Sequence, residues 1–275
     1  MRHSPSERTA GGAVFEAGPY TPVERVAARP DGQQNLLILC DHATNIQPPG
    51  IALGIAEEDM ARHIAWDVGA RGVTLALAEA LGAPAVLSRF SRLVIDPNRG
   101  EDDPTLVMKL YDGTLIPGNR GVDAVETERR LDLYYRPYHA AIAAELDRIE
   151  RAGHQPRIVS VHSFTPQFRG RPARPWHVGL LWDRDARLVE PLFEALDLER
   201  LEDGTPLVVG DNEPYTGALV GDCMYRHGTQ PGRPHVLIEV RNDLIETPED
   251  QAAWGRRLAG CLLRALAGMP AAEIG

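Results

Sequence analysis

The sequence predicts an α/β protein whose mostly parallel sheet is covered by helices on both faces. Short apolar runs alternate along the chain with longer segments of helical periodicity, which is the pattern of βαβ units. The runs hold few polar residues, as strands buried on both faces do. The chain has 275 residues, 43% hydrophobic and 25% charged, so it is long enough for one sizeable core.

Regular structure is predicted to begin at residue 35. Residues 1–34 are rich in proline, glycine and charge, and we interpret them as a partly ordered lead-in. Residues 35–275 are expected to form a single domain. Seven short apolar runs are predicted as strands: 35–40, 83–88, 92–96, 157–161, 177–182, 206–210 and 235–240.

Four helices are predicted from periodicity and end signals. The first, 57–82, has acids in its first turn and Gly82 at its end. The second, 124–153, contains Pro137, which should kink or break it. Shorter helices are expected at 185–197 and about 249–267. Polar loops follow the strands and should gather along one edge of the sheet.

Composition excludes several classes of function. The net charge of −10 argues against a nucleic-acid partner, although a local pocket can still be basic. The three cysteines, Cys40, Cys223 and Cys261, form no CxxC pair, so we expect no disulfide framework and a cytoplasmic location. No signal-like or membrane-spanning apolar stretch is visible. The sequence does not indicate an oligomeric state.

Polar side chains stand at the ends of three predicted strands. His42 follows the first in "CDHATN", His162 follows another in "VHSF", and Glu239 ends the last in "LIEVRND". In open α/β sheets, residues at strand ends can converge on one site. Neutral imidazoles suit zinc, and a glutamate beside a water at such a site can act as general base. By itself the pattern only suggests a metal-dependent hydrolase.

The motif order resembles the zinc carboxypeptidase superfamily and, more closely, the N-formylglutamate amidohydrolase family. "CDHATN", "SRLVIDPNR", "DNEPYTG" and "LIEVRND" carry the closer resemblance, which covers roughly residues 35–265. It implies a three-layer α/β/α fold with a mostly parallel mixed sheet, like that of zinc exopeptidases. It also implies Zn²⁺, or another divalent metal, and hydrolysis of N-formyl-L-glutamate to formate and L-glutamate, as in histidine breakdown.

The same resemblance assigns the metal ligands and the substrate residues. His42 and His162 correspond to metal ligands, and Asn98 and Arg99 to the dipeptide that binds the substrate carboxylate. Asn45 stands where carboxypeptidases have a ligand glutamate, and an amide oxygen is a poor ligand for zinc. Either Asn45 binds weakly, or another acid completes the site, or the metal is loosely held; Asp41 and Asp67 are the candidate acids.

Three further residues are candidates for contact with a small anionic N-acyl amino acid. Arg92 could bind a second carboxylate, or pair with Asp96 instead. Arg241, on the same strand face as Glu239, could bind a carboxylate or stabilise an oxyanion, or simply pair with Asp243. Tyr215 could reach a substrate from its turn-rich loop.

Two alternatives to this function remain open at the level of sequence. One is another N-acyl amino acid deacylase or a carboxypeptidase-like enzyme with the same machinery. The other is a metal-free binding protein that has lost activity, which Asn45 in place of an acid would favour. Cysteine and serine chemistry is not favoured, because Cys223 lacks an ordered His and acid and Ser163 lacks a GxSxG elbow.

Overall fold

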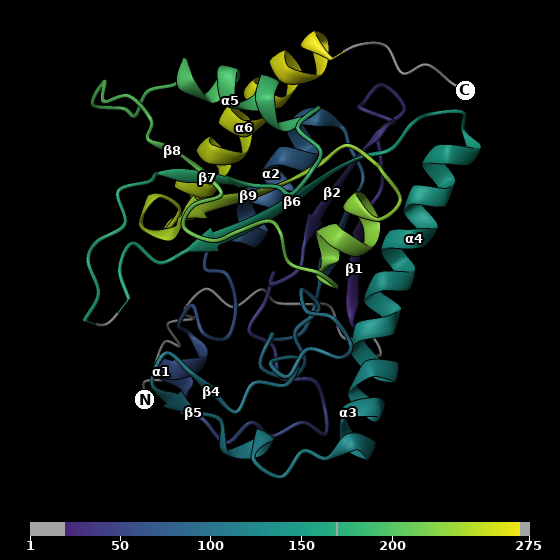
Figure 1. Ribbon diagram of the computed structural model, residues 1–275, viewed down its shortest axis with the longest axis vertical. Helices are drawn as coiled ribbons and strands as arrows, with labels where there is room; N and C mark the ends of the chain where they lie inside the picture. Colours follow the sequence, from purple (N-terminus) through teal and green to yellow (C-terminus); the bar gives the residue numbers. More distant parts are fainter. Residues whose placement is uncertain (1–19, 169, 270–275) are drawn as a thin grey trace, which may run out of the picture.

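A computed structural model describes residues 20–168 and 170–269 and shows a central seven-stranded sheet (Figure 1). The strand order is β1-β3-β2-β6-β9-β7-β8. The strands are β1 (Val23–Val26), β2 (Leu36–Cys40), β3 (Ala85–Ser88), β6 (Arg157–Phe164), β7 (Val178–Leu181), β8 (Val209–Asp211) and β9 (His235–Arg241). Strands β3, β2, β6 and β9 run parallel, β7 pairs antiparallel with β9, and β1 pairs antiparallel with β3.

Helices cover the sheet on both faces. On one face α2 and α5 pack against the long C-terminal α6 over the first apolar core. On the other face α4 lies beside β1 and β3 over a second core, and it forms one side of the molecule in Figure 1. The predicted three-layer α/β/α class is therefore confirmed. The helices are α2 (Ala70–Leu81), α3 (Ala124–Arg130), α4 (Arg136–Arg151), α5 (Val189–Asp197) and α6 (Pro248–Gly268).

Smaller elements lie beyond the ends of the central strands. Figure 1 shows α1, the β4–β5 hairpin and α3 together at the bottom of the view. The long connections that hold them are the polar loops expected at one edge of the sheet. Their bounds are Glu57–Met60 for α1, Leu110–Tyr111 for β4 and Thr114–Leu115 for β5, with short 3₁₀ turns at Pro117–Asn119 and Asn242–Leu244.

The predicted helix 57–82 is wrong in its middle. Only its ends are helical, as α1 and α2, and the chain between them forms turns. Gly69 precedes α2 with φ +81°, a left-handed conformation that a right-handed helix cannot contain. A Cβ at this position would lie 2.5 Å from the carbonyl oxygen of Ile245, so glycine is required. The break leaves Asp67 in a turn, with its backbone N–H donating to the carbonyl of His42 at 3.0 Å.

Three other predicted elements differ from the structure. Residues 92–94 form a turn and 95–96 are irregular, so no strand forms here, although Leu93, Val94 and Ile95 are buried as an apolar run should be. Burial explains the misleading pattern, because an apolar run looks the same in a strand and in a buried turn. The helix at 124–153 is interrupted just before Pro137 by a π-helical turn, Leu131–Tyr135. Strand β6 continues to Phe164, so His162 lies within it.

The described part of the lead-in joins the sheet. Val23–Val26 form β1, which pairs with β3 at the edge of the sheet. Residues 1–19, the rest of the predicted lead-in, lie outside the described residues. Within the described part of the chain, no helix has the length and apolar character needed to cross a membrane.

Candidate active site

Three neighbouring strands bring the sequence motifs together. Strands β2, β6 and β9 are adjacent in the sheet, and His162 on β6 is the register partner of Glu239 on β9. Because register partners present their side chains on the same face, the imidazole and the carboxyl lie side by side. His42 stands two residues after the end of β2, so the three motifs converge as predicted.

Asp67 lies between the two imidazoles. Its Oδ2 is 2.8 Å from Nδ1 of His162 and 3.3 Å from Nδ1 of His42. The ring centroids of His42 and His162 are 4.9 Å apart, and all three side chains are buried. Each offers one ligand atom, and these atoms lie within 4.8 Å of one another. Two imidazoles and one carboxylate are a donor set that catalytic zinc sites use, with one position left open.

A second carboxylate holds the outer nitrogen of each imidazole. Nε2 of His42 donates to Asp96 at 2.7 Å, and Nε2 of His162 donates to Asp41 at 2.8 Å. Asp41 is itself fixed by the hydroxyl groups of Ser160 and Tyr138, each at 2.9 Å. These contacts leave the two Nδ1 atoms facing Asp67. Carboxylate–imidazole pairs of this kind orient metal-binding histidines and raise their basicity.

The charges of this cluster favour a cation between the rings. Burial lowers the pKa of His162, but its hydrogen bonds to Asp41 and Asp67 outweigh this and raise it well above its usual range. Burial and Arg92 lower the pKa of His42, yet Asp96 and Asp67 raise it overall. Burial opposes ionisation of Asp67, but the two imidazoles hold the pKa of its carboxyl well below its usual range. The donor set therefore fits a divalent cation, which would replace two imidazole protons.

Glu239 has the character of a general base. Burial raises the pKa of its carboxyl to about 7, while the neighbouring His162 lowers it. Its Oε2 is buried and accepts no hydrogen bond from the described residues. A carboxylate with a free oxygen and a pKa near neutrality can take a proton from a water beside it.

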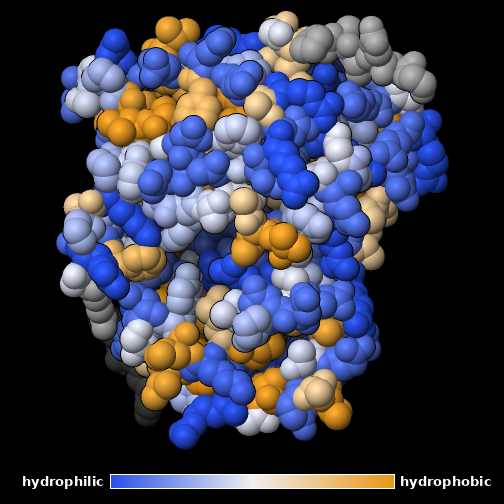
Figure 2. All heavy atoms as spheres, in the orientation of Figure 1, coloured by the Kyte–Doolittle hydropathy of each residue, from blue (hydrophilic) through white to orange (hydrophobic). Residues whose placement is uncertain are grey.

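These side chains line a cavity of about 360 Å³. Figure 2 shows this face hollowed between its upper and lower parts, with hydrophilic side chains inside. Arg99 also lines the cavity, and its buried Nε has no hydrogen-bond partner within the described ranges. Besides the cluster itself, the lining includes Arg92, Asn98, Arg99, Tyr111, Trp182, Tyr215 and Asp222.

Comparison with known proteins identifies the family. A sequence profile described as N-formylglutamate amidohydrolase matches residues 34–246. The chain belongs to the N-formylglutamate amidohydrolase family. It is similar to a gene product of Agrobacterium tumefaciens of known crystal structure, with a TM-score of 0.82 and 32% identity over 90% of this chain and 96% of that one. A crystal structure of N-formylglutamate amidohydrolase from Ralstonia eutropha matches with a TM-score of 0.66 and 25% identity, over 90% and 98% of the two chains.

Curated relatives match over shorter stretches. The chain is 32% identical to N-formylglutamate deformylase of Pseudomonas putida over 140 residues, 46% of this chain and 51% of that relative. It is 32% identical to the Pseudomonas aeruginosa enzyme of the same name over 130 residues, 43% of this chain and 48% of the relative. The match spans about half the length of these curated relatives.

Two predicted site residues of this family member lie elsewhere. Asn45 does not line the cavity, and its Nδ2 donates to the carbonyl of Met60 at 2.9 Å. Asp67 takes the place between the rings, as the sequence alternative allowed. Arg241 is also outside the cavity lining, and its Nε donates to Asp243 at 2.8 Å. A local ion pair two residues away thus holds Arg241, and a catalytic role for it is not supported.

Arg92 and Tyr215 also line the cavity, and each already makes polar contacts, although Nε of Arg92 has no hydrogen-bond partner among the described residues. The Arg92 guanidinium donates to Asp96 at 2.8 Å and to Asp67 at 3.5 Å. It therefore positions the carboxylates around the two histidines. The Tyr215 hydroxyl accepts a hydrogen bond from Arg174 at 3.2 Å, and the side chain is 38% exposed. Tyr215 thus lines the cavity and is partly exposed to solvent.

Sequence reasoning did not assign functions to two acids of the site. Asp96 opens the "DPNR" motif, and its position directly before a Pro-Asn-Arg turn was the available signal. Asp222 lines the cavity, and burial raises the pKa of its carboxyl to about 7. No spacing in the sequence connects Asp222 to the histidines.

Proposed function

We propose that this chain is a zinc-dependent amidohydrolase that cleaves N-formyl-L-glutamate to formate and L-glutamate. The observation that carries the proposal is the position of Asp67 between two imidazoles that are each hydrogen-bonded to a further carboxylate. Asp67 supplies the carboxylate ligand that is missing at position 45, where this chain has Asn45. The names of the family and of its relatives support the substrate. The residues that would hold zinc are His42, Asp67 and His162.

The chain's own residues divide the chemistry between them. Zinc, when bound, would supply Lewis acidity for the formyl carbonyl and lower the pKa of a water. Glu239 accepts a proton from the attacking water and delivers it to the amine nitrogen as the C–N bond breaks. Asp41 and Asp96 keep the two imidazoles oriented, and Arg92 holds Asp67 and Asp96 in place.

The cavity provides a basic wall for an acidic substrate. Arg99 and Asn98 line it, and Nε of Arg99 has no hydrogen-bond partner among the described residues. A guanidinium binds a carboxylate through two parallel hydrogen bonds. This local positive charge explains how a chain with a net charge of −10 can bind an anion.

A substrate panel and a metal assay test the proposal. Initial rates on N-formyl-L-glutamate, N-acetyl-L-glutamate, N-formyl-L-leucine and short peptides should be highest for the first. A preference for acetyl compounds or peptides would instead favour the deacylase or carboxypeptidase alternative. Protein that binds no divalent metal and hydrolyses none of these compounds would be a binding protein that has lost activity.

Replacing Arg99 tests how the substrate is recognised. Arg99→Lys keeps the charge but loses the bidentate geometry, so kcat/KM for N-formyl-L-glutamate should fall, and Arg99→Ala should lower it further. A charge-assisted hydrogen bond contributes roughly 1.5–3 kcal/mol, so the loss should be about tenfold to a hundredfold. Arg89→Ala is the matched control, because Arg89 does not line the cavity and donates to Thr21 at 3.0 Å.

A double-mutant cycle assigns the loss to one carboxylate. Substrates in which either carboxylate of N-formyl-L-glutamate is replaced by a neutral amide should react slowly with the parent enzyme. For one of them, Arg99→Ala should add little further loss. Strictly additive losses for both amides would mean that Arg99 binds neither carboxylate and has a structural role.

A further inference from the structure

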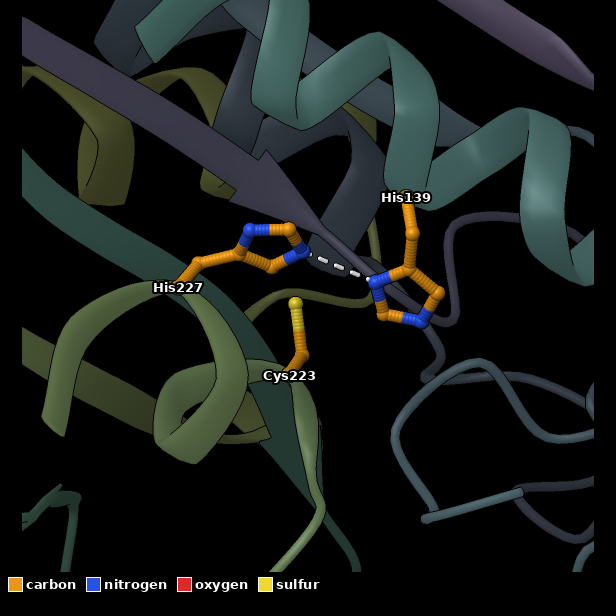
Figure 3. Close-up of side chains that lie close together, drawn as sticks. All are labelled: His139, Cys223 and His227. Atoms are coloured by element: carbon orange, nitrogen blue, oxygen red, sulfur yellow. Dashed lines mark hydrogen bonds between the residues drawn. The ribbon is translucent and has the colours of Figure 1, made fainter. Parts of the chain in front are cut away.

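A second group of potential metal ligands lies apart from the two histidines of the active site. Nδ1 of His139, on α4, is 2.9 Å from Nε2 of His227, which lies in the π-helical turn Tyr225–Thr229. The two rings are stacked, with centroids 5.1 Å apart and planes 20° from parallel. Figure 3 shows the Cys223 sulfur pointing toward the hydrogen bond between the rings. One ligand atom from each residue lies within 4.8 Å of the others.

Hydrogen bonding leaves a lone pair of His139 directed into this group. Nε2 of His139 donates to the carbonyl of Pro97 at 3.1 Å, so Nε2 carries the proton of the neutral ring. Nδ1 is therefore an acceptor, and it now accepts from Nε2 of His227. A carbonyl that fixes the outer nitrogen of an imidazole is the usual support of a metal-binding histidine.

Burial and charge also suit a metal ion. His139, Cys223 and His227 are all buried. Burial, with the neighbouring His227, lowers the pKa of His139 to about 3, and burial with Arg226 lowers that of His227 to about 4. Both rings are thus neutral, as metal ligands must be. Burial and the Asp41 carboxylate raise the pKa of the Cys223 thiol well above its usual range, so the thiolate would form only with a cation bound. Asp41 acts electrostatically on all three side chains, and together with that thiolate it would balance the charge of a dication.

The group supports the wall of the catalytic cavity. Pro97, the partner of His139, and Asn98 are consecutive in the "DPNR" turn. The backbone N–H of Cys223 donates to Oδ1 of Asn98 at 3.1 Å. Asp222, which lines the cavity, directly precedes Cys223. Whatever fixes His139, Cys223 and His227 therefore also fixes the segment that carries Asn98 and Arg99.

The geometry points to a second, structural metal site formed by His139, Cys223 and His227 and suited to zinc. Imidazole and thiolate are the ligands that zinc prefers in structural sites. Binding breaks the hydrogen bond between the rings: the His227 proton moves from Nε2 to Nδ1, and the Cys223 thiol releases its proton to solvent. No oxidation or reduction takes place. The proposed hydrolysis does not use any of these three residues.

Cobalt spectroscopy distinguishes this site from the catalytic one. The full chain is stripped of metal with a chelator under reducing conditions and titrated with Co²⁺ alone. The catalytic group offers only nitrogen and oxygen ligands, whereas the second group offers a thiolate. We expect about two ions per chain, one of them with a thiolate-to-cobalt charge-transfer band in the near ultraviolet.

Matched variants identify the residues that produce the charge-transfer band. Cys223→Ser and His227→Gln should each lose the band and about one ion, whereas Cys261→Ser, another buried free cysteine outside both groups, should keep both. His162→Ala should lose the other ion and keep the band. Circular dichroism checks that each variant is folded. Because Cys223→Ser and His227→Gln test the same site, the test still stands if one of these two variants misfolds.

Two results would overturn the second site. The first is parent protein that binds a single ion without a charge-transfer band, which would leave His139 and His227 as a hydrogen-bonded pair only. The second is a band that survives in a folded Cys223→Ser variant. Neither measurement depends on hydrolysis, so failure of the proposed reaction would leave these spectra unchanged.

Discussion

Replacing Glu239 by glutamine is expected to lower kcat by about 10²–10⁴-fold, the usual effect of removing one acid–base group. Glutamine keeps the size of the side chain but cannot accept the proton of the attacking water. Glu239 is not among the three expected metal ligands, so the variant should still bind metal. Steady-state kinetics on N-formyl-L-glutamate, together with metal analysis of the same preparation, measure both effects. A kcat equal to that of the parent would mean that another group accepts the proton of the attacking water.

The same variant should show how burial of Glu239 affects stability. Burial raises the pKa of this carboxyl from 4.5 to about 7. A raised folded-state pKa contributes stability that is present below pH 4.5 and is lost as the pH rises through about 7. Chelator-treated Glu239→Gln should therefore be more stable than the parent at pH 8, and the difference should shrink toward pH 4. Urea unfolding at a series of pH values measures it, and a difference that did not vary with pH would contradict a buried, titrating Glu239.

Replacing Asp67 by asparagine is expected to lower the affinity for zinc by more than about 100-fold, the upper end of the loss for an outer-shell partner. The amide keeps the shape of the side chain but has no charge to bind the ion. Asn45→Ala should change the affinity little, because the structure places Asn45 against Met60. Competition titrations with a zinc chelator measure both affinities.

This pair of variants decides between the alternatives that the sequence leaves open. If Asn45→Ala weakened zinc binding as much as Asp67→Asn did, the third ligand would be Asn45, and the position of Asp67 between the rings would reflect hydrogen bonding alone. Circular dichroism of Asp67→Asn guards against misfolding, because the substitution also removes a partner of Arg92.

Local sequence signals predicted most of the fold. β2, β6 and β9 are buried apolar runs, and α6 begins with a capping box of Thr247 and Asp250. The break at Gly69 was not predictable in this way, because helical periodicity continues through it. The contact that requires glycine there comes from Ile245, which lies far along the chain.

The site was predictable where its residues lie on the central strands or follow one of them. His42, His162 and Glu239 converge because their strands are neighbours, and strand order is a property of the whole fold. Asp67 reaches the rings only through the unpredicted turn before α2. The group of His139, Cys223 and His227 has no sequence signal, because α4 and the π-helical turn meet only in the folded chain. For Arg241, strand alternation predicts the face of the sheet but does not predict the partner, and the structure pairs Arg241 with Asp243.

The position of β9 determines the order in which the protein can assemble. Among the described residues β9 is the last strand to be made, yet it lies between β6 and β7 in the sheet. A nascent chain that ends before His235 therefore contains β7 and β8 but lacks the strand that joins them to the rest. Such a chain contains the proposed zinc ligands but lacks Glu239, the proposed general base. Such long-range pairing makes folding slow, and until β9 inserts, the inner edges of β6 and β7 are open to pairing with other chains.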